Sequence, residues 1–251
     1  MVSLKSEREI VLMREGAKIL KEVFLKLRDF VKPGIRTQDI DIKAEKLIRS
    51  LGAEPAFLGY YGFPATICTS VNEQVVHGIP SDRVIKNGDM LSLDIGVKHK
   101  GYYSDAARTW PVGQISKECT KLIEVTRQSL YEGIKGIDRG SRLGDLSHRI
   151  QQYVESHGYS VVRDFVGHGI GRALHEDPQV PNYGERGRGI VIEEGLVIAI
   201  EPMVNLGSPE VRILQDGWTV VTQDGSLSAH HEETVAICKN GPEVLTQFET
   251  D

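Results

Sequence analysis

The second half of this sequence repeats the pattern of the first half, and this repeat limits the folds available to the chain. Shifting the chain by 106 residues superposes Gly34 on Gly140, Arg36 on Arg142, Asp39 on Asp145, Ser50 on Ser156 and Gly52 on Gly158. The apolar positions 40, 44, 47 and 48 fall on 146, 150, 153 and 154, and a shift of 107 places Asp94 on Glu201. A supersecondary pattern that recurs in this way indicates an internal duplication.

Each repeat begins with two amphipathic helices and continues with strand-like segments. The first helix opens with a capping box, Ser6 followed by Glu9, and its apolar residues recur at three- and four-residue spacing up to residue 31. A second helix ends near residue 51, and the helices of the second half are expected over 116–134 and 146–154. We therefore predict an α+β fold with four helices backing one antiparallel sheet. It would be a single domain over residues 1–251, with halves of about 1–113 and 114–251 related by a pseudo-twofold axis.

Residues 89–105 are predicted to form a β-hairpin that carries two acids. Leu91, Leu93 and Ile95 alternate with polar residues, which is the period of a strand, and a polar turn containing glycine follows. A two-residue loop at 99–100 would place Asp94 opposite Asp105, about 4.5–5.5 Å away. Carboxylates this close repel each other unless a cation lies between them. A register shifted by one residue would instead make both of them solvated surface acids.

Five acids and histidines lie in apolar or glycine-rich strand surroundings: Asp94, Asp105, His168, Glu201 and Glu232. Four carboxylates and one imidazole form a hard, oxygen-rich set that suits two divalent ions such as Mn(II), Fe(II) or Co(II). Two ions sharing a water would lower its pKa enough to give a nucleophile at neutral pH. Glu201 ends the buried strand 196–200 and needs a partner there, because an unpaired buried charge is very costly. The alternative partner for Glu201 is a structural arginine.

Two further histidines stand outside this ligand set. His77 lies in the segment VVHGIP and His175 in the segment ALHEDP. Either imidazole could donate a hydrogen bond to a carbonyl oxygen or to a developing oxyanion. Judged singly, each is better explained as a structural imidazole whose hydrogen bonds are satisfied within the fold.

The composition excludes several classes of protein. The net charge is −5, with 30 basic and 35 acidic residues, so we do not expect a nucleic-acid-binding protein. The first eight residues contain no apolar run of the signal-peptide type, and no span reaches transmembrane length, so no membrane association is expected. The 3 cysteines, Cys68, Cys119 and Cys238, are scattered without metal-ligand spacing, which favours a reducing compartment. We expect the protein in the cytoplasm.

Seven short segments give the chain a close resemblance to the methionine aminopeptidases. They are residues 70–80 (SVNEQVVHGIP), 94–96 (DIG), 104–108 (SDAAR), 167–171 (GHGIG), 175–178 (HEDP), 199–202 (AIEP) and 226–232 (SLSAHHE). The resemblance implies the duplicated pita-bread fold and removal of the initiator methionine from nascent proteins whose second residue is small. It is closest to the short bacterial type I enzymes. It also suggests a monomer that works close to the ribosome on nascent polypeptide N-termini.

The resemblance also implies roles for individual residues. Asp94, Asp105 and Glu232 would hold one ion, and Asp105, His168, Glu201 and Glu232 the other, the ions being cobalt, manganese, iron or zinc. A metal-bridged hydroxide would attack the peptide carbonyl while His175 stabilises the tetrahedral intermediate. His77 would contact the peptide, and Glu201 would carry a proton to the leaving amine. Four residues would line the methionine pocket: Tyr60, Phe63, Cys68 and Trp218.

The chain departs from the family pattern at two positions. Glu233 stands where a histidine is usual, which predicts an altered metal preference or altered surroundings of the site, and Leu174 stands where an aromatic residue is common, which would loosen the methionine pocket. Glu232 is preferred to Glu233 as the ligand because the spacing Ser-Ala-x-x-Glu fixes it. The alternatives are a proline-directed aminopeptidase or prolidase of the same fold, and a metal-free pita-bread protein that only binds a peptide or a partner.

Overall fold

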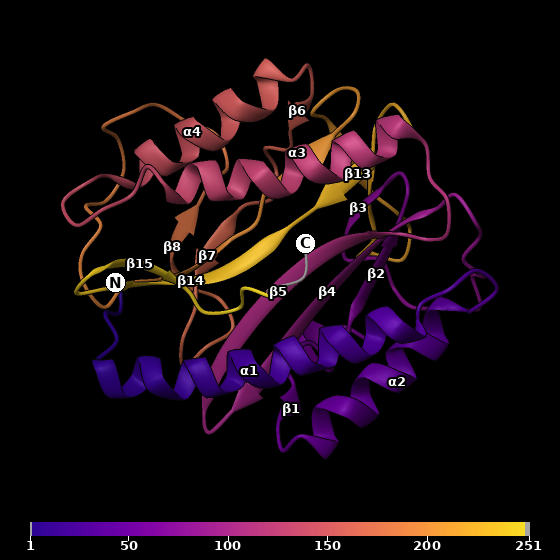
Figure 1. The fold of residues 1–251 in the computed structure, drawn as a ribbon, viewed down its shortest axis with the longest axis horizontal. Coiled ribbons are helices and arrows are strands. Elements are labelled where there is room, and N and C mark those ends of the chain that lie inside the picture. The colour runs from indigo at the N-terminus through magenta and orange to yellow at the C-terminus, as the bar shows by residue number, and fades with distance from the viewer. Residues whose placement is uncertain (1, 249–251) are drawn as a thin grey trace.

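The computed structural model describes residues 2–248 of the chain and contains four long helices (Figure 1). They are α1 (Glu7–Phe30), α2 (Thr37–Ser50), α3 (Lys117–Ile134) and α4 (Leu143–Ser156). Ser6 caps α1 together with Glu9 in a capping box, and Ser116 caps α3 by accepting a hydrogen bond from the Cys119 amide. The predicted helix pair in each half is therefore confirmed.

Fifteen short strands and one 3₁₀ turn, η1 (Tyr60–Gly62), complete the described fold. The strands are β1 (Glu54–Pro55), β2 (Cys68–Val71), β3 (Gln74–Val76), β4 (Met90–His99), β5 (Tyr102–Pro111), β6 (Ser160–Val161), β7 (Gly167–Gly169), β8 (Glu176–Val180), β9 (Val197–Ile200), β10 (Met203–Asn205), β11 (Val211–Ile213), β12 (Val220–Thr222), β13 (Ser228–His230), β14 (Glu232–Cys238) and β15 (Gly241–Val244).

One nine-stranded antiparallel sheet joins the two halves. Its order is β1-β4-β5-β14-β9-β7-β8, with β2 added on β4 and β15 on β14. The central pair, β5 with β14, links the halves through Ala107 opposite Glu232 and Ala106 opposite Glu233. In Figure 1, α1 and α2 run along the first-half strands, and α3 and α4 run along those of the second half. This arrangement is the α+β layering that the sequence predicts.

The two halves repeat each other in hydrogen bonding as well as in order. An isolated bridge pairs Arg36 with Val84 in the first half, and the equivalent bridge pairs Arg142 with Val191 in the second. Gly34 N–H donates to the Ile85 carbonyl at 2.8 Å, and Gly140 N–H donates to the Ile192 carbonyl at 3.0 Å. Each helix pair buries its apolar face against strands of its own half, around Phe24 and Leu93 in the first and Ile150 and Ile198 in the second.

The hairpin of β4 and β5 forms as predicted, but its register differs by two residues. Asp94 lies opposite Ala107 and Asp105 opposite Gly96, because the turn is Lys100-Gly101 rather than His99-Lys100. Lys100 and Gly101 have φ values of 49° and 84°, the left-handed pair that a type I′ turn requires. Since side chains alternate along a strand, a shift of two keeps both acids on one face as diagonal neighbours. The predicted direct pairing is therefore wrong, and so is the alternative of two solvated acids, because Asp105 is only 3% exposed.

Among residues 2–248, no helix is long and apolar enough to cross a membrane.

Candidate metal centre

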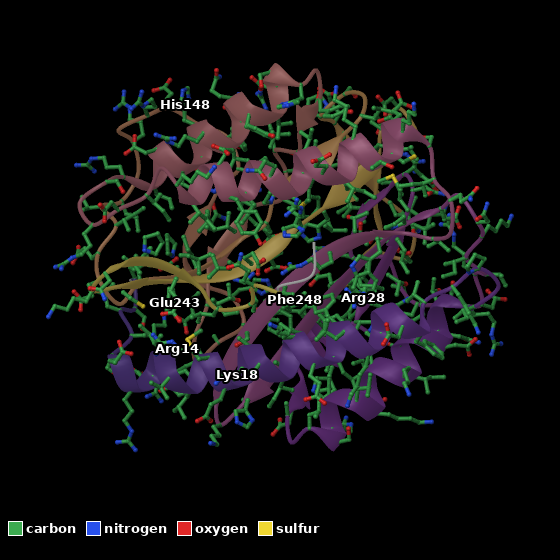
Figure 2. All side chains as sticks on the ribbon, viewed as in Figure 1. Arg14, Lys18, Arg28, His148, Glu243 and Phe248 are labelled. Atoms are coloured by element: carbon green, nitrogen blue, oxygen red, sulfur yellow. The ribbon has the colours of Figure 1, made fainter. Side chains whose placement is uncertain are left out.

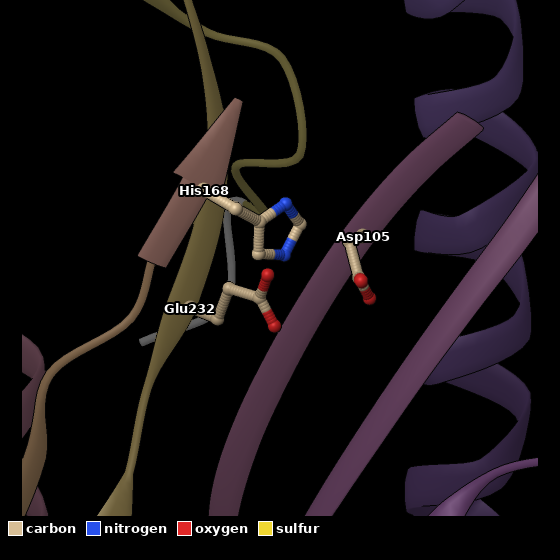
Figure 3. Close-up of side chains that lie close together, drawn as sticks. All are labelled: Asp105, His168 and Glu232. Atoms are coloured by element: carbon tan, nitrogen blue, oxygen red, sulfur yellow. The ribbon is translucent and has the colours of Figure 1, made fainter. Parts of the chain in front are cut away.

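Three side chains from three strands of the nine-stranded sheet meet at its centre. Asp105 comes from β5, His168 from β7 and Glu232 from the start of β14, and Figure 3 shows them pointing toward one another. One ligand atom from each lies within 4.8 Å of the other two, and all three residues are buried. This geometry can hold a metal ion between two carboxylates and one imidazole.

The strand register explains how Asp94 and Glu232 come to the same place. Ala107 of β5 pairs with Asp94 on one side and with Glu232 on the other, so the three residues form one row across the sheet. Residues in such a row point to the same face. The small side chain of Ala107 leaves room between the two acids, and Asp105 lies two residues along β5 on the same face.

The carboxylates in this cluster lack hydrogen-bond partners for several of their oxygens. Asp94 Oδ1, Asp105 Oδ1 and Glu232 Oε1 are buried and accept no hydrogen bond from the part of the chain that the structure describes. Burial raises the pKa of Asp105 to about 7. Burial, together with repulsion from neighbouring carboxylates, also raises the pKa values of Asp94 and Glu232 well above their usual range. A cation would satisfy the free oxygens and remove the repulsion, so these residues fit a divalent metal.

Glu201, at the end of β9, faces two histidines rather than an arginine. Its Oε1 lies 3.6 Å from His168 Nε2, and its Oε2 lies 3.8 Å from His230 Nε2. No arginine of residues 2–248 forms an ion pair with it, so the alternative of a structural arginine partner is not realised. Burial raises the pKa of Glu201 well above its usual range, with a further contribution from the Asp105 charge.

The His168 ring is held in a form suited to metal binding. Its Nδ1 lies 2.9 Å from the Gly169 carbonyl oxygen, which fixes the proton on Nδ1 and leaves Nε2 free as an acceptor. Burial, with the nearby His175, lowers the pKa of His168 to about 3. The ring is therefore neutral at physiological pH, as a metal ligand must be.

His77 and His175 both line the cavity beside this cluster. His175 Nδ1 lies 2.8 Å from the Tyr60 hydroxyl, and its ring centroid is 4.1 Å from that of His168. His77 adopts a positive φ of 59° immediately after β3 and packs edge-on against Phe165. Burial lowers the pKa of His77 to about 4, so its imidazole is neutral at pH 7.

The cavity in front of the acids has a volume of about 280 Å³ and an aromatic wall. All eleven residues predicted as metal ligands, catalytic histidines or pocket residues line it. They include the four expected around the methionine side chain: Tyr60, Phe63, Cys68 and Trp218. The Phe63 and Trp218 rings meet edge to face at 5.1 Å, and Cys68 of β2 lies opposite Asp94 of β4. The pocket therefore combines buried carboxylates with aromatic rings, and the Cys68 thiol lies beside Asp94.

Phe57 and Tyr61 also line this cavity, and sequence reasoning did not include them. Both belong to the segment 57–63, which is rich in aromatic residues. That clustering is the only feature of the sequence that could have indicated their place in the cavity wall. Leu174, singled out as a departure from the family pattern, is buried in the cavity wall.

Glu233 points to the opposite face of β14 from Glu232. Its Oε1 accepts hydrogen bonds from Arg108 Nη2 and the Tyr131 hydroxyl, each at 2.7 Å. The Thr246 hydroxyl donates to its Oε2 at 2.5 Å. Glu232 and not Glu233 therefore faces the acid cluster. Glu233, the residue that departs from the family pattern, forms a buried ion pair with Arg108 on the opposite face of the sheet.

Comparisons with known proteins agree with this arrangement. A methionine aminopeptidase from Clostridium perfringens is 57% identical over 246 residues, which cover 98% of this chain and 99% of that protein. The crystal structure of methionine aminopeptidase from Rickettsia prowazekii has a TM-score of 0.97 at 41% identity, covering 98% of this chain and 100% of the other. A prolidase from Pyrococcus furiosus has a TM-score of 0.80 at 25% identity, and the match covers 98% of this chain but 66% of the prolidase.

These neighbours confirm the pita-bread fold. The sequence profile of metallopeptidase family M24 matches residues 11–239, which is most of the chain. The chain therefore belongs to metallopeptidase family M24.

Proposed function

We propose that this protein removes the N-terminal methionine from polypeptides whose second residue is small. The observation that carries the proposal is the cavity, in which a buried carboxylate–imidazole cluster and an aromatic wall face the same space. The relatives named methionine aminopeptidase support the same reaction, because they match this chain over nearly its whole length.

Two divalent ions would be held by the residues at the sheet centre. Asp94, Asp105 and Glu232 would bind one, and Asp105, His168, Glu201 and Glu232 would bind the other. Bound there, such ions polarise a carbonyl and lower the pKa of water toward neutrality. Cobalt, manganese, iron and zinc all suit this ligand set, in which oxygen predominates.

The aromatic end of the cavity would take the methionine side chain. A thioether packs well against ring edges, and Phe63, Trp218 and Tyr60 offer three rings there. The substrate's free amine would then lie on the Asp94 side of the cluster. This fixes the first peptide bond of the substrate in front of the acids.

Three residues would act on the scissile peptide bond. His175, oriented by the Tyr60 hydroxyl, would donate a hydrogen bond to the oxyanion that develops on the carbonyl. His77, at the other side of the cavity, would contact the peptide. Glu201 would accept a proton from the attacking water and pass it to the nitrogen of the leaving amine.

The biological setting is part of the proposal. Nascent polypeptide N-termini would be the substrates, and the enzyme would act as a cytoplasmic monomer close to the ribosome. The proline-directed alternative has less support, since the aromatic slot suits an unbranched side chain and the prolidase is the more distant relative. A protein that only bound peptides would gain nothing from unpartnered buried carboxylates.

The test is hydrolysis of Met-Ala-Ser compared with Pro-Ala-Ser and a Gly-Pro dipeptide. The enzyme is stripped with a chelator and then titrated with Mn(II), Fe(II), Co(II) or Zn(II), and an Asp105→Asn variant serves as the control. Metal-dependent release of methionine alone is the expected result, with no release by the variant. Release of proline or glycine alone would transfer the assignment to the proline-directed enzymes.

A further inference from the structure

The loop that carries His175 has little regular structure of its own. Residues 171–175 lie between β7 and β8 without belonging to a helix or strand, although Leu174 and His175 line the cavity. Within the loop, Gly171 N–H donates to the Ala173 carbonyl at 3.1 Å, and Ala173 N–H donates to Glu176 Oε1 at 3.0 Å. The Glu176 side chain, immediately after His175, therefore folds back and ties the loop to itself through the Ala173 amide.

The other oxygen of Glu176 is held by a lysine from the far end of the sequence. Lys5 Nζ lies 2.5 Å from Glu176 Oε2, and the two side chains are 3% and 14% exposed. Lys5 Nζ also donates to the Ser3 carbonyl at 2.8 Å. Burial acts to raise the pKa of Glu176, but the hydrogen bonds from Lys5 and from the Ala173 amide outweigh it and the pKa is lowered. The loop is thus closed by a salt bridge between the buried Lys5 and the partly buried Glu176.

The backbone around Lys5 is fixed by close packing against the second half. Lys5 N–H donates to the Gly195 carbonyl at 2.6 Å, and Figure 1 shows the N-terminal end of the chain beside β14 and β15. A Cβ added at Gly195 would lie 2.6 Å from the Lys5 carbonyl oxygen, and one added at Gly171 would lie 2.3 Å from Lys5 Cε. Gly195 therefore makes room for the Lys5 backbone, and Gly171 makes room for its side chain.

We propose that Lys5 and Glu176 are positioning residues for His175: the segment before α1 reaches across to the second half and holds the catalytic loop in place through this buried ion pair. The inference rests on the function proposed above. His175 contacts both Tyr60 and the ring of His168, so a shift of the loop changes its place relative to the reacting carbonyl. Misplacement of a catalytic group by about 1 Å can lower the rate about 100-fold.

The test compares Lys5→Met, Glu176→Gln and the double variant with the wild-type enzyme, all loaded with metal. Each single variant should lower kcat for Met-Ala-Ser about 10- to 100-fold with a smaller change in KM. The double variant should be no worse than the poorer single variant, because both changes remove the same contact. Multiplied effects in the double variant, or kcat within about twofold of wild type in folded single variants, would overturn the proposal.

A control variant separates this role from a general loss of contact between the halves. Arg14 of α1 pairs with Glu243 of β15 at 2.7 Å and also joins the N-terminal region to the second half (Figure 2). Neither residue lines the cavity. Arg14→Met should leave kcat unchanged. An equal loss of kcat in this variant would show that Lys5 acts only through stability.

Hydrogen exchange gives a measurement that does not depend on turnover. In Lys5→Met, the amide of Ala173 should exchange at least about tenfold faster than in wild type, while Arg14→Met should not change it. If Lys5→Met does not fold, Glu176→Gln provides the same measurement, since it keeps the shape of the side chain. Unchanged exchange at Ala173 in folded variants contradicts the proposal even if the protein cleaves no methionine peptide.

Discussion

Replacing Arg108 by methionine should be among the most destabilising single changes in this protein. Arg108 lies 4% exposed on β5, and its guanidinium donates to the carbonyls of Ala107, Glu232 and Thr246 as well as to the Glu233 carboxylate. It also stacks 4.3 Å from the centre of the Phe248 ring, close to the C-terminal end of the described chain (Figure 2). The residue therefore joins both halves of the sheet to the segment that follows β15.

The expected loss in the free energy of unfolding arises because Arg108→Met leaves the Glu233 carboxylate buried without its partner. Glu233 is fully buried, which acts to raise its pKa, but the Arg108 charge together with the interactions of His231 and Thr246 lowers that pKa to about 2. Removing one partner of a buried ion pair typically costs about 3–5 kcal/mol. For a chain of this size each kcal/mol lowers Tm by about 2–4 °C, so we expect a decrease of about 6–20 °C.

Urea unfolding of the chelator-treated protein measures this cost directly. Arg108→Met combined with Glu233→Gln removes both charges, while the glutamine oxygen can still accept a hydrogen bond from the Tyr131 hydroxyl and its amide can donate one to the Thr246 hydroxyl. The double variant should therefore be less destabilised than the sum of the two single variants, by about 2 kcal/mol or more. Strict additivity, or a loss below about 1 kcal/mol for Arg108→Met, would refute the reasoning.

The other predictions concern the acid cluster, the helix cap, residue 233 and the cavity wall. Glu233→His should lower stability by removing the partner of Arg108, and calorimetry should find no gain in metal affinity, because residue 233 lies on the opposite face from the ligands. Asp105→Asn should stabilise the chelated protein by removing one of the repelling carboxylates, and it should abolish the roughly 4 kcal/mol that metal at a thousandfold above Kd adds. Glu9 has its pKa lowered from 4.5 to about 2 by hydrogen bonds from Ser6 and Tyr102, so its contribution is complete above pH 4.5 and lost toward pH 2; the Tm difference between wild type and Glu9→Gln should shrink over that range. Gly96→Ala should cost about 1–3 kcal/mol and raise KM for methionine peptides, since its Cβ would lie 2.6 Å from the ring of Phe57 in the cavity wall.

The duplication, the helices and the set of acids could be predicted because each leaves a local pattern in the sequence. Apolar spacing and the Ser6 cap define α1, and the repeat of Asp94 at Glu201 indicates that both halves supply carboxylates. The hairpin register could not be fixed in this way. It depends on whether Lys100 or His99 begins the turn, and a lysine in the left-handed conformation is rarely favoured by its own side chain.

Ion pairs between segments that are distant in the sequence could not be predicted. Nothing near Lys5 indicates that it pairs with Glu176, and nothing near Arg108 indicates that it pairs with Glu233. Lys5 lies in the polar segment SLKSER, whose composition is typical of exposed, solvated charges. Burial of these charges is decided only when the two halves close against each other.

The split of the ligand set between the halves has a consequence for how the protein is made. Asp94 and Asp105 belong to the first half, whereas His168, Glu201 and Glu232 belong to the second. At about 5–20 residues per second, translation takes about 6–25 s to pass from residue 105 to residue 232. Until Glu232 has been made the proposed ligand set is incomplete, and until Glu176 has been made Lys5 has no carboxylate to pair with. The proposed site of a newly made copy is thus complete, and the proposed activity can begin, only once β14 has been synthesised.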